Sequence, residues 1–376
     1  MGRSSAISLT ALLALGVSLP LLPTASAVSA SRRTTAPTGT QLEELKAPAR
    51  YFGTSMAVSG NTAIVTAPQS GGWAYVFTKD GAAWKQSASL RGSDSVSVGP
   101  VAISGSHAVV GGSGVLGRVY VFARTGSTWK QVAKLAGSDT VAADFFGDAV
   151  AISGTTVIVG AIRPRTRNFK AGRAYVFSQD TTGWKHQAEL ASPVPAVQGF
   201  GWAVAISGKI AVVGATGCAF VFTKTGANWD PSAEIKDSDT NNSETFGESL
   251  AISGNALVVG ASGQNRVYVF TDHAGVWSQT ADLTGSDTTS GDAFGFSVSI
   301  SDNSIAVGAS NKGDGTGRAY VFKRAGADWN QVGELIGSDT SIGDAFGESV
   351  TTLGDTTFVG APSHAAFSGR AYVFAP

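Results

Sequence analysis

Four cationic side chains gather in one short stretch of an otherwise charge-poor sequence. Arg163, Arg165, Arg167 and Lys170 lie within eight residues, whereas charged residues make up only 14% of the chain. A local positive field of this kind suits an anionic ligand or an acidic glycan. The same charges could instead serve only to solvate a long loop. These four residues are therefore a candidate ligand-binding site for which both interpretations stay open.

Two tryptophans, Trp73 and Trp202, fall outside the repeating pattern described below. Trp202 directly follows a Phe-Gly pair, at a position where other copies of the repeat carry Asp148, Glu248 or Glu348. An indole ring beside carboxylates could stack on a sugar ring. Packing between neighbouring elements is an equally good interpretation for both tryptophans. We take Trp73 and Trp202 as further candidate ligand-binding residues.

Acidic residues recur in pairs five positions apart, each pair shortly before a Phe-Gly dipeptide. Such pairs could bind a metal ion weakly, or Asp side chains could cap turns by accepting hydrogen bonds from backbone N–H groups two residues on. Because the pairs recur in four copies, we favour the structural role and expect a ligand site at positions that occur once. The pairs are Asp139 and Asp144, Asp239 and Glu244, Asp287 and Asp292, and Asp339 and Asp344.

The sequence offers no motif for catalysis. Its four histidines, His107, His186, His273 and His364, have no metal-ligand spacing. Neither a G-x-S-x-G nucleophile elbow nor a phosphate-binding loop is present. The single cysteine, Cys218, precedes an apolar strand and is expected to be a small buried residue. We predict no catalytic residue, no cofactor and no metal site, with a hydrolase that uses acids from different repeats as the alternative.

These side chains must be positioned by a sequence that repeats seven times. Each copy opens on Phe-Gly, which is degraded to Val98-Gly99 in the second copy. An aromatic-Val-Phe triplet follows in every copy, and a tryptophan comes seven to nine residues later in six of them. The triplets begin at Tyr75, Tyr120, Tyr175, Phe220, Tyr268, Tyr320 and Tyr372.

Each repeat predicts four short strands. Two apolar runs flank a Ser-Gly-Asn type turn such as residues 253–255, which indicates a tight β-hairpin, and the triplet and the tryptophan segment supply two more strands. Seven four-stranded units of about 45–50 residues are typical of a β-propeller. We therefore predict an all-β fold, a seven-bladed β-propeller spanning residues 40–376 as a single domain.

The last repeat lacks its fourth strand, and the start of the domain supplies a replacement. The chain ends just after the triplet at Tyr372, whereas residues 41–45 (QLEEL) align with residues 331–335 (QVGEL), the fourth strand of the sixth repeat. Pairing of the N-terminal strand with the last blade would close the ring and cover two sheet edges that otherwise invite aggregation.

The Phe-Gly, Val-Gly-Ala and aromatic-Val-Phe anchors together resemble the FG-GAP repeat, the blade unit of the integrin α-subunit propeller and of many bacterial secreted proteins. The resemblance covers residues 40–376 and looks most like the bacterial subgroup. It implies ligand recognition or adhesion. The integrin hairpin between strands 1 and 2 carries a calcium loop, but the hairpins of this sequence, such as residues 59–61, are too short and too poor in acids to supply six to eight oxygen ligands. No calcium site is therefore expected at these hairpins.

In such a blade the 1–2 and 3–4 turns lie on one face, and the 2–3 and 4–1 connections lie on the other. The second face holds most of the length variation, so it is the expected ligand face. The Arg163–Lys170 loop, Trp73 and the residues after each Phe-Gly fall there. Residues 312–315 (KGDG), in the sixth 2–3 connection, are expected to form only a turn.

The N-terminus is expected to be a cleaved signal peptide. Arg3 precedes an apolar stretch from Ala6 to Leu22, and residues 25–27 (ASA) fit a cleavage site, so residues 1–27 would be removed and 28–39 would form a flexible lead-in. Lysine plus arginine and aspartate plus glutamate both number 27, which gives no net charge to attract nucleic acid, and no segment is long and apolar enough to span a membrane. We predict a secreted monomer that recognises an extracellular glycan or protein surface, with a structural scaffold as a further alternative.

Overall fold

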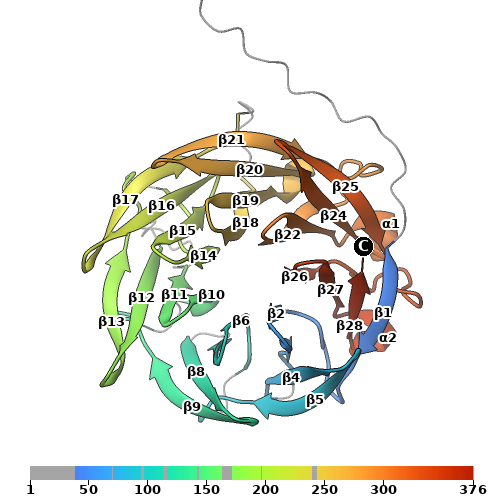
Figure 1. Cartoon of the computed structure of the whole chain (residues 1–376), viewed down its shortest axis with the longest axis horizontal. Coiled ribbons are helices and arrows are strands. Elements are labelled where there is room, and N and C mark those ends of the chain that lie inside the picture. Colours follow the sequence, from blue (N-terminus) through green and yellow to red (C-terminus); the bar gives the residue numbers. More distant parts are fainter. Residues whose placement is uncertain are drawn as a thin grey trace, which may run out of the picture. The chain divides into compact units, whose positions relative to one another are not determined.

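The computed structural model describes residues 39–375, apart from residues 70, 95–96, 113–116, 142–143, 163–171, 196 and 239–243. In this described part the strands form seven antiparallel four-stranded sheets arranged as the blades of a ring, with the first strand of each blade nearest the centre (Figure 1). The predicted seven-bladed β-propeller is thus confirmed. None of the helices in the described part is long and apolar enough to cross a membrane.

The blades follow one another along the chain. Blade 1 comprises β2 (Met56–Ser59), β3 (Thr62–Ala67), β4 (Trp73–Asp80) and β5 (Ala83–Leu90); blade 2 comprises β6 (Val101–Ser104), β7 (His107–Gly112), β8 (Arg118–Thr125) and β9 (Thr128–Leu135). Blade 3 comprises β10 (Phe146–Ser153), β11 (Thr156–Ala161), β12 (Arg173–Asp180) and β13 (Gly183–Leu190); blade 4 comprises β14 (Val204–Ser207), β15 (Ile210–Ala215), β16 (Cys218–Thr225) and β17 (Asn228–Ile235).

The remaining blades carry three short helical turns in their 2–3 connections. Blade 5 comprises β18 (Phe246–Ser253), β19 (Ala256–Ala261), η1 (Ser262–Gln264), β20 (Arg266–His273) and β21 (Val276–Leu283). Blade 6 comprises β22 (Phe294–Ser301), β23 (Ser304–Ala309), α1 (Lys312–Gly315), β24 (Arg318–Ala325) and β25 (Asp328–Leu335). Blade 7 comprises β26 (Ser349–Leu353), β27 (Thr356–Ala361), α2 (His364–Phe367), β28 (Arg370–Ala375) and the N-terminal strand β1 (Thr40–Leu45).

Strand β1 closes the ring as predicted. It pairs antiparallel with β28, from Thr40 opposite Ala375 to Leu45 opposite Ala371. Its Gln41 Oε1 accepts a hydrogen bond from the backbone N–H of Ser338 at 2.9 Å. In blade 6 the Oε1 atom of Gln331 accepts the equivalent bond from Ser286 at 2.8 Å. The first strand of the domain is therefore the fourth strand of blade 7.

The repeated anchors meet in the contacts between and within blades. The ring of Phe52 is fully buried and lies 5.8 Å from Tyr75 and 5.9 Å from Phe77, so the Phe-Gly motif packs on the triplet of its own blade. Gly53 has φ of 100°, and a Cβ there would lie 2.3 Å from the carbonyl oxygen of Arg370 in blade 7. Only glycine tolerates both the conformation and the close approach of the neighbouring blade.

The hydrophobic core lies mainly between neighbouring blades. One buried cluster, for example, joins Val212, Val221 and Ile235 of blade 4 to Phe246 and Tyr268 of blade 5. Full burial of an aliphatic or aromatic side chain of this size stabilises the fold by about 1.5–3 kcal/mol. Because each blade buries its faces against two neighbours, the ring is held together by apolar contacts that need closure to be complete.

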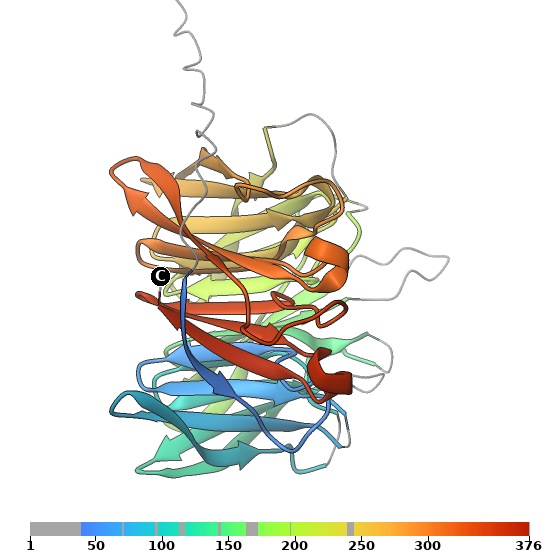
Figure 2. The same cartoon turned by 90° about the vertical axis from the view of Figure 1, so that its right-hand side faces the viewer.

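The two faces of the ring differ as predicted (Figure 2). On one face the 1–2 hairpins are two-residue turns, as between Ser59 and Thr62, which pair with each other. Serine side chains bond these turns across blades; Ser59 Oγ, for instance, accepts a hydrogen bond from the backbone N–H of Gly105 at 3.1 Å. On the other face the 2–3 connections range from two residues in blade 4 to eleven in blade 3.

Candidate functional site

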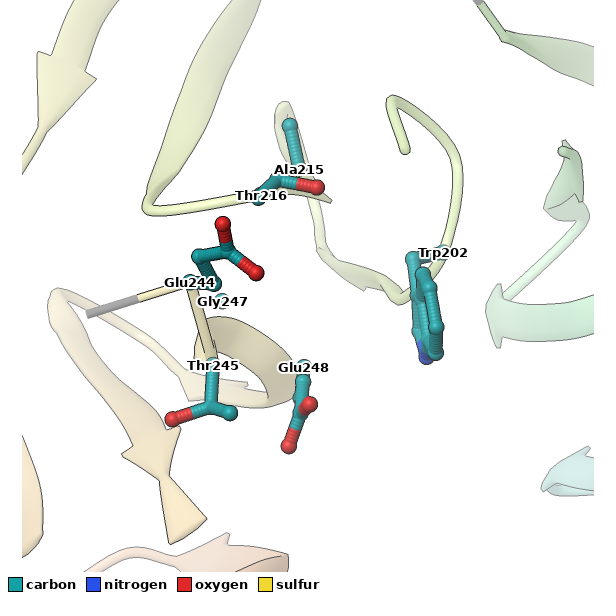
Figure 3. A pocket seen from close by; sticks show the side chains of 7 residues that line it. All are labelled: Trp202, Ala215, Thr216, Glu244, Thr245, Gly247 and Glu248. Carbon is teal, nitrogen blue, oxygen red and sulfur yellow. The ribbon is translucent and has the colours of Figure 1, made fainter. Parts of the chain in front are cut away.

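A small pocket on the face of the variable connections gathers one of the candidate tryptophans and two glutamates (Figure 3). Trp202 precedes β14, while Glu244 and Glu248 lie at the start of blade 5, so the pocket lies between blades 4 and 5. Its volume is about 140 Å³, and Ala215, Thr216, Thr245 and Gly247 complete the lining.

Trp202 presents its ring to solvent. Its side chain is 51% exposed, whereas the other seven tryptophans are buried or half-buried. The local backbone is fixed by a turn in which the N–H of Trp202 donates to the carbonyl oxygen of Gly199 at 3.0 Å. An exposed indole on this turn offers a flat apolar platform to a ring-shaped ligand.

The two glutamates of the pocket keep acceptor capacity. Glu248 Oε2 accepts a hydrogen bond from the hydroxyl of Ser262 at 2.7 Å. Among the described residues, neither Glu248 nor Glu244 forms an ion pair, and the exposed Glu244 forms no side-chain hydrogen bond. Carboxylate oxygens in this state can accept hydrogen bonds from hydroxyl or amino groups of a ligand.

The residues that follow Phe-Gly lie at or just before the start of the innermost strands and differ in exposure. Phe296 is 45% exposed. Burial raises the pKa of Asp148 to about 6 and also raises the pKa of Glu348. Desolvation dominates these shifts because no partner for either carboxylate lies among the described residues.

The acid pairs of the inter-blade loops have a structural role that differs in detail from the expectation. The first acid of each described pair accepts a hydrogen bond from the tyrosine that opens the triplet of the same blade, for example Tyr320 Oη to Asp287 Oδ1 at 2.7 Å. Burial and then the Asp287 carboxylate raise the pKa of Tyr320. Equivalent bonds join Tyr120 to Asp94, Tyr175 to Asp139, and Tyr372 to Asp339.

The second acid caps a turn in the opposite direction from the one expected. Asp344 Oδ2 accepts the backbone N–H of Ser341 at 2.6 Å, three residues before it, rather than an N–H group two residues after an aspartate. Asp292 and Thr289, and Asp144 and Val141, repeat this bond at 2.7 and 2.9 Å. Asp239 lies outside the described residues.

In blades 6 and 7 a basic side chain from the 2–3 connection completes the cluster. Lys312 Nζ lies 3.1 Å from Asp287 Oδ2 and 3.4 Å from Asp292 Oδ2. In blade 7 the buried His364 takes this place, with Nδ1 2.8 Å from Asp344 Oδ2 and Nε2 3.3 Å from Asp339 Oδ2. Residues 312–315 do form a turn, with Gly313 and Asp314 at positive φ, but Lys312 gives the turn a role that the sequence interpretation missed.

Blade 4 departs from this arrangement in both partners at once. Its triplet begins with Phe220, which has no hydroxyl, and its inter-blade loop (residues 191–199) has no acid. In blade 5, Tyr268 donates to Gln264 at 3.0 Å. Blade 4 thus loses the tyrosine hydroxyl and the aspartate together, whereas blade 1 keeps Tyr75 without an acid in residues 46–52, so the sequence signal for the pairing is incomplete.

Of the remaining candidate ligand-binding residues, only Trp73 is among those that the structure describes. The cationic loop residues Arg163, Arg165, Arg167 and Lys170 lie outside the described residues. Trp73 is half-buried beside the core of blade 1, and the Arg91 guanidinium lies 5.3 Å from its ring centre.

The histidines lie in four different blades, and Cys218 is buried as expected, with its pKa raised to about 11 by burial. Within the described ranges no group of three histidine, cysteine, aspartate or glutamate side chains could hold a metal ion.

Comparison with known proteins identifies the repeat. A family model described as FG-GAP repeat matches residues 129–177, 229–270, 277–322 and 329–374. A search of curated proteins finds no match.

Two solved structures share the fold. A chain of the Mitotic Checkpoint Complex has a TM-score of 0.61 at 13% identity, covering 96% of this chain and 99% of that one. The RRP9 WD40 repeats give a TM-score of 0.62 at 12% identity, covering 91% and 99%. At these identities the likeness concerns the fold alone.

Proposed function

The chain is an FG-GAP repeat β-propeller, and from that premise we propose that it is an exported recognition module that binds a glycan on the face of the 2–3 and 4–1 connections. The FG-GAP propeller family is not typically enzymatic, and the fold fits recognition or adhesion. The observation that carries the proposal is the exposed ring of Trp202 beside the carboxylates of Glu244 and Glu248.

The pocket favours a sugar that carries an amino group. A sugar ring stacks on an indole through its C–H face, and its polar substituents reach the surrounding acceptors. Glu244 occupies the sequence position of Asp292 and Asp344, two residues before the phenylalanine of Phe-Gly. Those aspartates face Lys312 and His364, whereas the 2–3 connection of blade 5 before Arg266 carries no cation. A ligand ammonium group would take the place of the basic side chain that this connection lacks.

The test is binding of a glucosamine trimer, with the N-acetylglucosamine trimer as the uncharged match. Isothermal titration should give tighter binding of the amine, and Trp202→Ala should weaken it at least about tenfold. Phe296→Ala is the control, because Phe296 is also exposed after a Phe-Gly pair but does not line the pocket. Equal binding by the wild type and the Trp202 variant would refute the proposal.

Export is a separate part of the proposal, supported by the sequence of residues 1–27, which lie outside the described part. If the segment is a signal peptide, N-terminal sequencing of protein recovered from the culture medium should begin at Val28. Protein retained in the cell with its original N-terminus would contradict it.

A hydrolase is the second candidate function, favoured by the pKa of Asp148 near 6, which suits a proton donor at neutral pH. Release of reducing ends from the same oligosaccharides, abolished by Asp148→Asn, would support it. Binding without turnover would support recognition alone.

A further inference from the structure

A second, larger pocket lies where blades 7 and 1 meet. We call it the seam pocket; its volume is about 510 Å³, within the range typical of small-molecule sites. It is lined by residues 47–50 after β1, by Gln69, Trp73 and Tyr75 of blade 1, and by Ser368 before β28. The connection that follows the ring-closing strand β1 therefore forms one wall of this pocket.

The charge of the seam pocket is positive. Arg50 is the only charged residue in its lining, and the lining holds no carboxylate. The guanidinium of Arg50 lies 5.8 Å from the ring centre of Phe367 and 5.9 Å from that of Tyr51. These two rings lie 5.3 Å apart, and the N–H of Tyr51 donates to the carbonyl oxygen of Phe367 at 2.8 Å, so the aromatic support of Arg50 is itself fixed.

A second arginine reinforces the field. Arg91 lies over the ring of Trp73, and its Nε atom is buried without a hydrogen-bond partner in the described structure. Neither Arg50 nor Arg91 forms an ion pair with any described residue, whereas Arg173, Arg318 and Arg370 all pair with glutamates. Within the part of the chain that the structure describes, two cations held by aromatic rings rather than by carboxylates give a positive field beside the pocket.

We propose that the seam pocket binds a carboxylate-bearing sugar, with its ring on Trp73 and its carboxylate on Arg50. The planar guanidinium matches a carboxylate in a two-pronged hydrogen bond. Gln69 and Ser368 supply polar groups for the sugar hydroxyls, and Arg91 is a positioning residue that holds the indole. This site is independent of the Trp202 pocket and selects the opposite charge.

The experiment compares a galacturonic acid tetramer with its methyl ester, which has the same rings without the charge. Titration of the full chain should show the acid binding at least about tenfold more tightly than the ester. Arg50→Met should remove this preference while leaving the melting temperature unchanged, because Arg50 is exposed. Trp73→Phe should weaken both ligands while preserving an apolar ring at the site.

The matched control is Arg324→Met. Arg324 is exposed, forms no ion pair with a described residue, and lies at the end of β24 next to the 3–4 turn. It should not affect galacturonate binding, and neither should Trp202→Ala. Equal affinity for acid and ester, no effect of Arg50→Met, or equal losses in the Arg50 and Arg324 variants would overturn the proposal. Equally tight binding of a tetraglutamate peptide would also overturn it, since charge alone would then explain the affinity.

Discussion

The inter-blade loops that lead into blades 5 and 7 place an acid at the same position with opposite results. Asp344 is buried, caps the turn at Ser341 and faces His364. Glu244 is exposed, has no ion-pair partner among the described residues, and lines the pocket with Trp202. The repeated acid is thus buried and hydrogen-bonded in blade 7, whereas in blade 5 it is exposed in a pocket.

The backbone explains part of this difference. The residue after the acid has φ of 57° at Ala345 in blade 7 and 60° at Ala293 in blade 6. In blade 5 this residue is Thr245, which has negative φ as expected for a β-branched side chain. A repeat position therefore has a fixed role only where the neighbouring residues reproduce the local geometry.

Replacing each of the two acids by alanine should show the difference between blades 5 and 7 most clearly, as a difference in lost stability. Asp344→Ala removes the acceptor of the buried His364 Nδ1 and of the Ser341 N–H, while His364 keeps its contact with Asp339, so we expect a loss of about 2 kcal/mol in the free energy of unfolding. Glu244→Ala should change it by no more than about 0.5 kcal/mol. Urea unfolding of both variants measures the difference, and similar losses would mean that Glu244 is structural as well.

Removing a tyrosine hydroxyl should have the next largest effect on stability. Tyr320→Phe removes the bond to Asp287 and should cost about 1–2 kcal/mol. Phe220→Tyr in blade 4 should not stabilise the protein, because no aspartate stands in its inter-blade loop to accept the new hydroxyl. Melting temperatures of both variants test this, and a stabilised Phe220 variant would contradict the pairing rule.

Asp148 has no side-chain partner within the described ranges, so its contribution to stability should depend on pH in the direction set by burial. The folded state raises the pKa of Asp148 to about 6, above the value near 4 of an unfolded chain. Its contribution to stability is fully present below about pH 4 and is lost as the pH rises through 6. Asp148→Asn should therefore be more stable than the wild type at pH 8, by on the order of 1–2 kcal/mol, and equal to it at pH 4. Thermal melts across this range decide the point, and a constant difference would argue against the shift.

Chelation of metal ions by EDTA should have the smallest effect on the melting temperature. In blades 6 and 7 Lys312 and His364 already face the acid pairs, so a metal ion has no free carboxylate pair to occupy there. The melting temperature should be the same with and without EDTA. A drop of many degrees would show a metal site and would move attention to the acid pairs.

The ring could be predicted because the residues of the recurring motifs are the ones that form the contacts within and between blades. Phe52, Gly53 and Tyr75 recur as motifs since each blade repeats the same packing, and Gln41 could be aligned with Gln331 because both make the same hydrogen bond. Because the same motif recurs in every blade, such long-range contacts can be predicted from a single sequence.

The site was less predictable because it depends on contacts that occur once. The pairing of Lys312 and His364 with aspartates links a 2–3 connection to an inter-blade loop through residues of different types, so no repeated letter marks it. The lack of an ion-pair partner for Glu244 among the described residues and the seam pocket around Arg50 likewise follow from three-dimensional neighbours, not from spacing along the chain.

The most direct test of ligand binding by the Trp202 pocket is a crystal structure of the protein with the glucosamine trimer. We expect one sugar ring to cover the indole of Trp202, with an amino nitrogen about 2.7–2.9 Å from a carboxylate oxygen of Glu244 or Glu248. A trimer bound elsewhere, with Trp202 uncovered and both glutamates free of ligand contacts, would contradict the account.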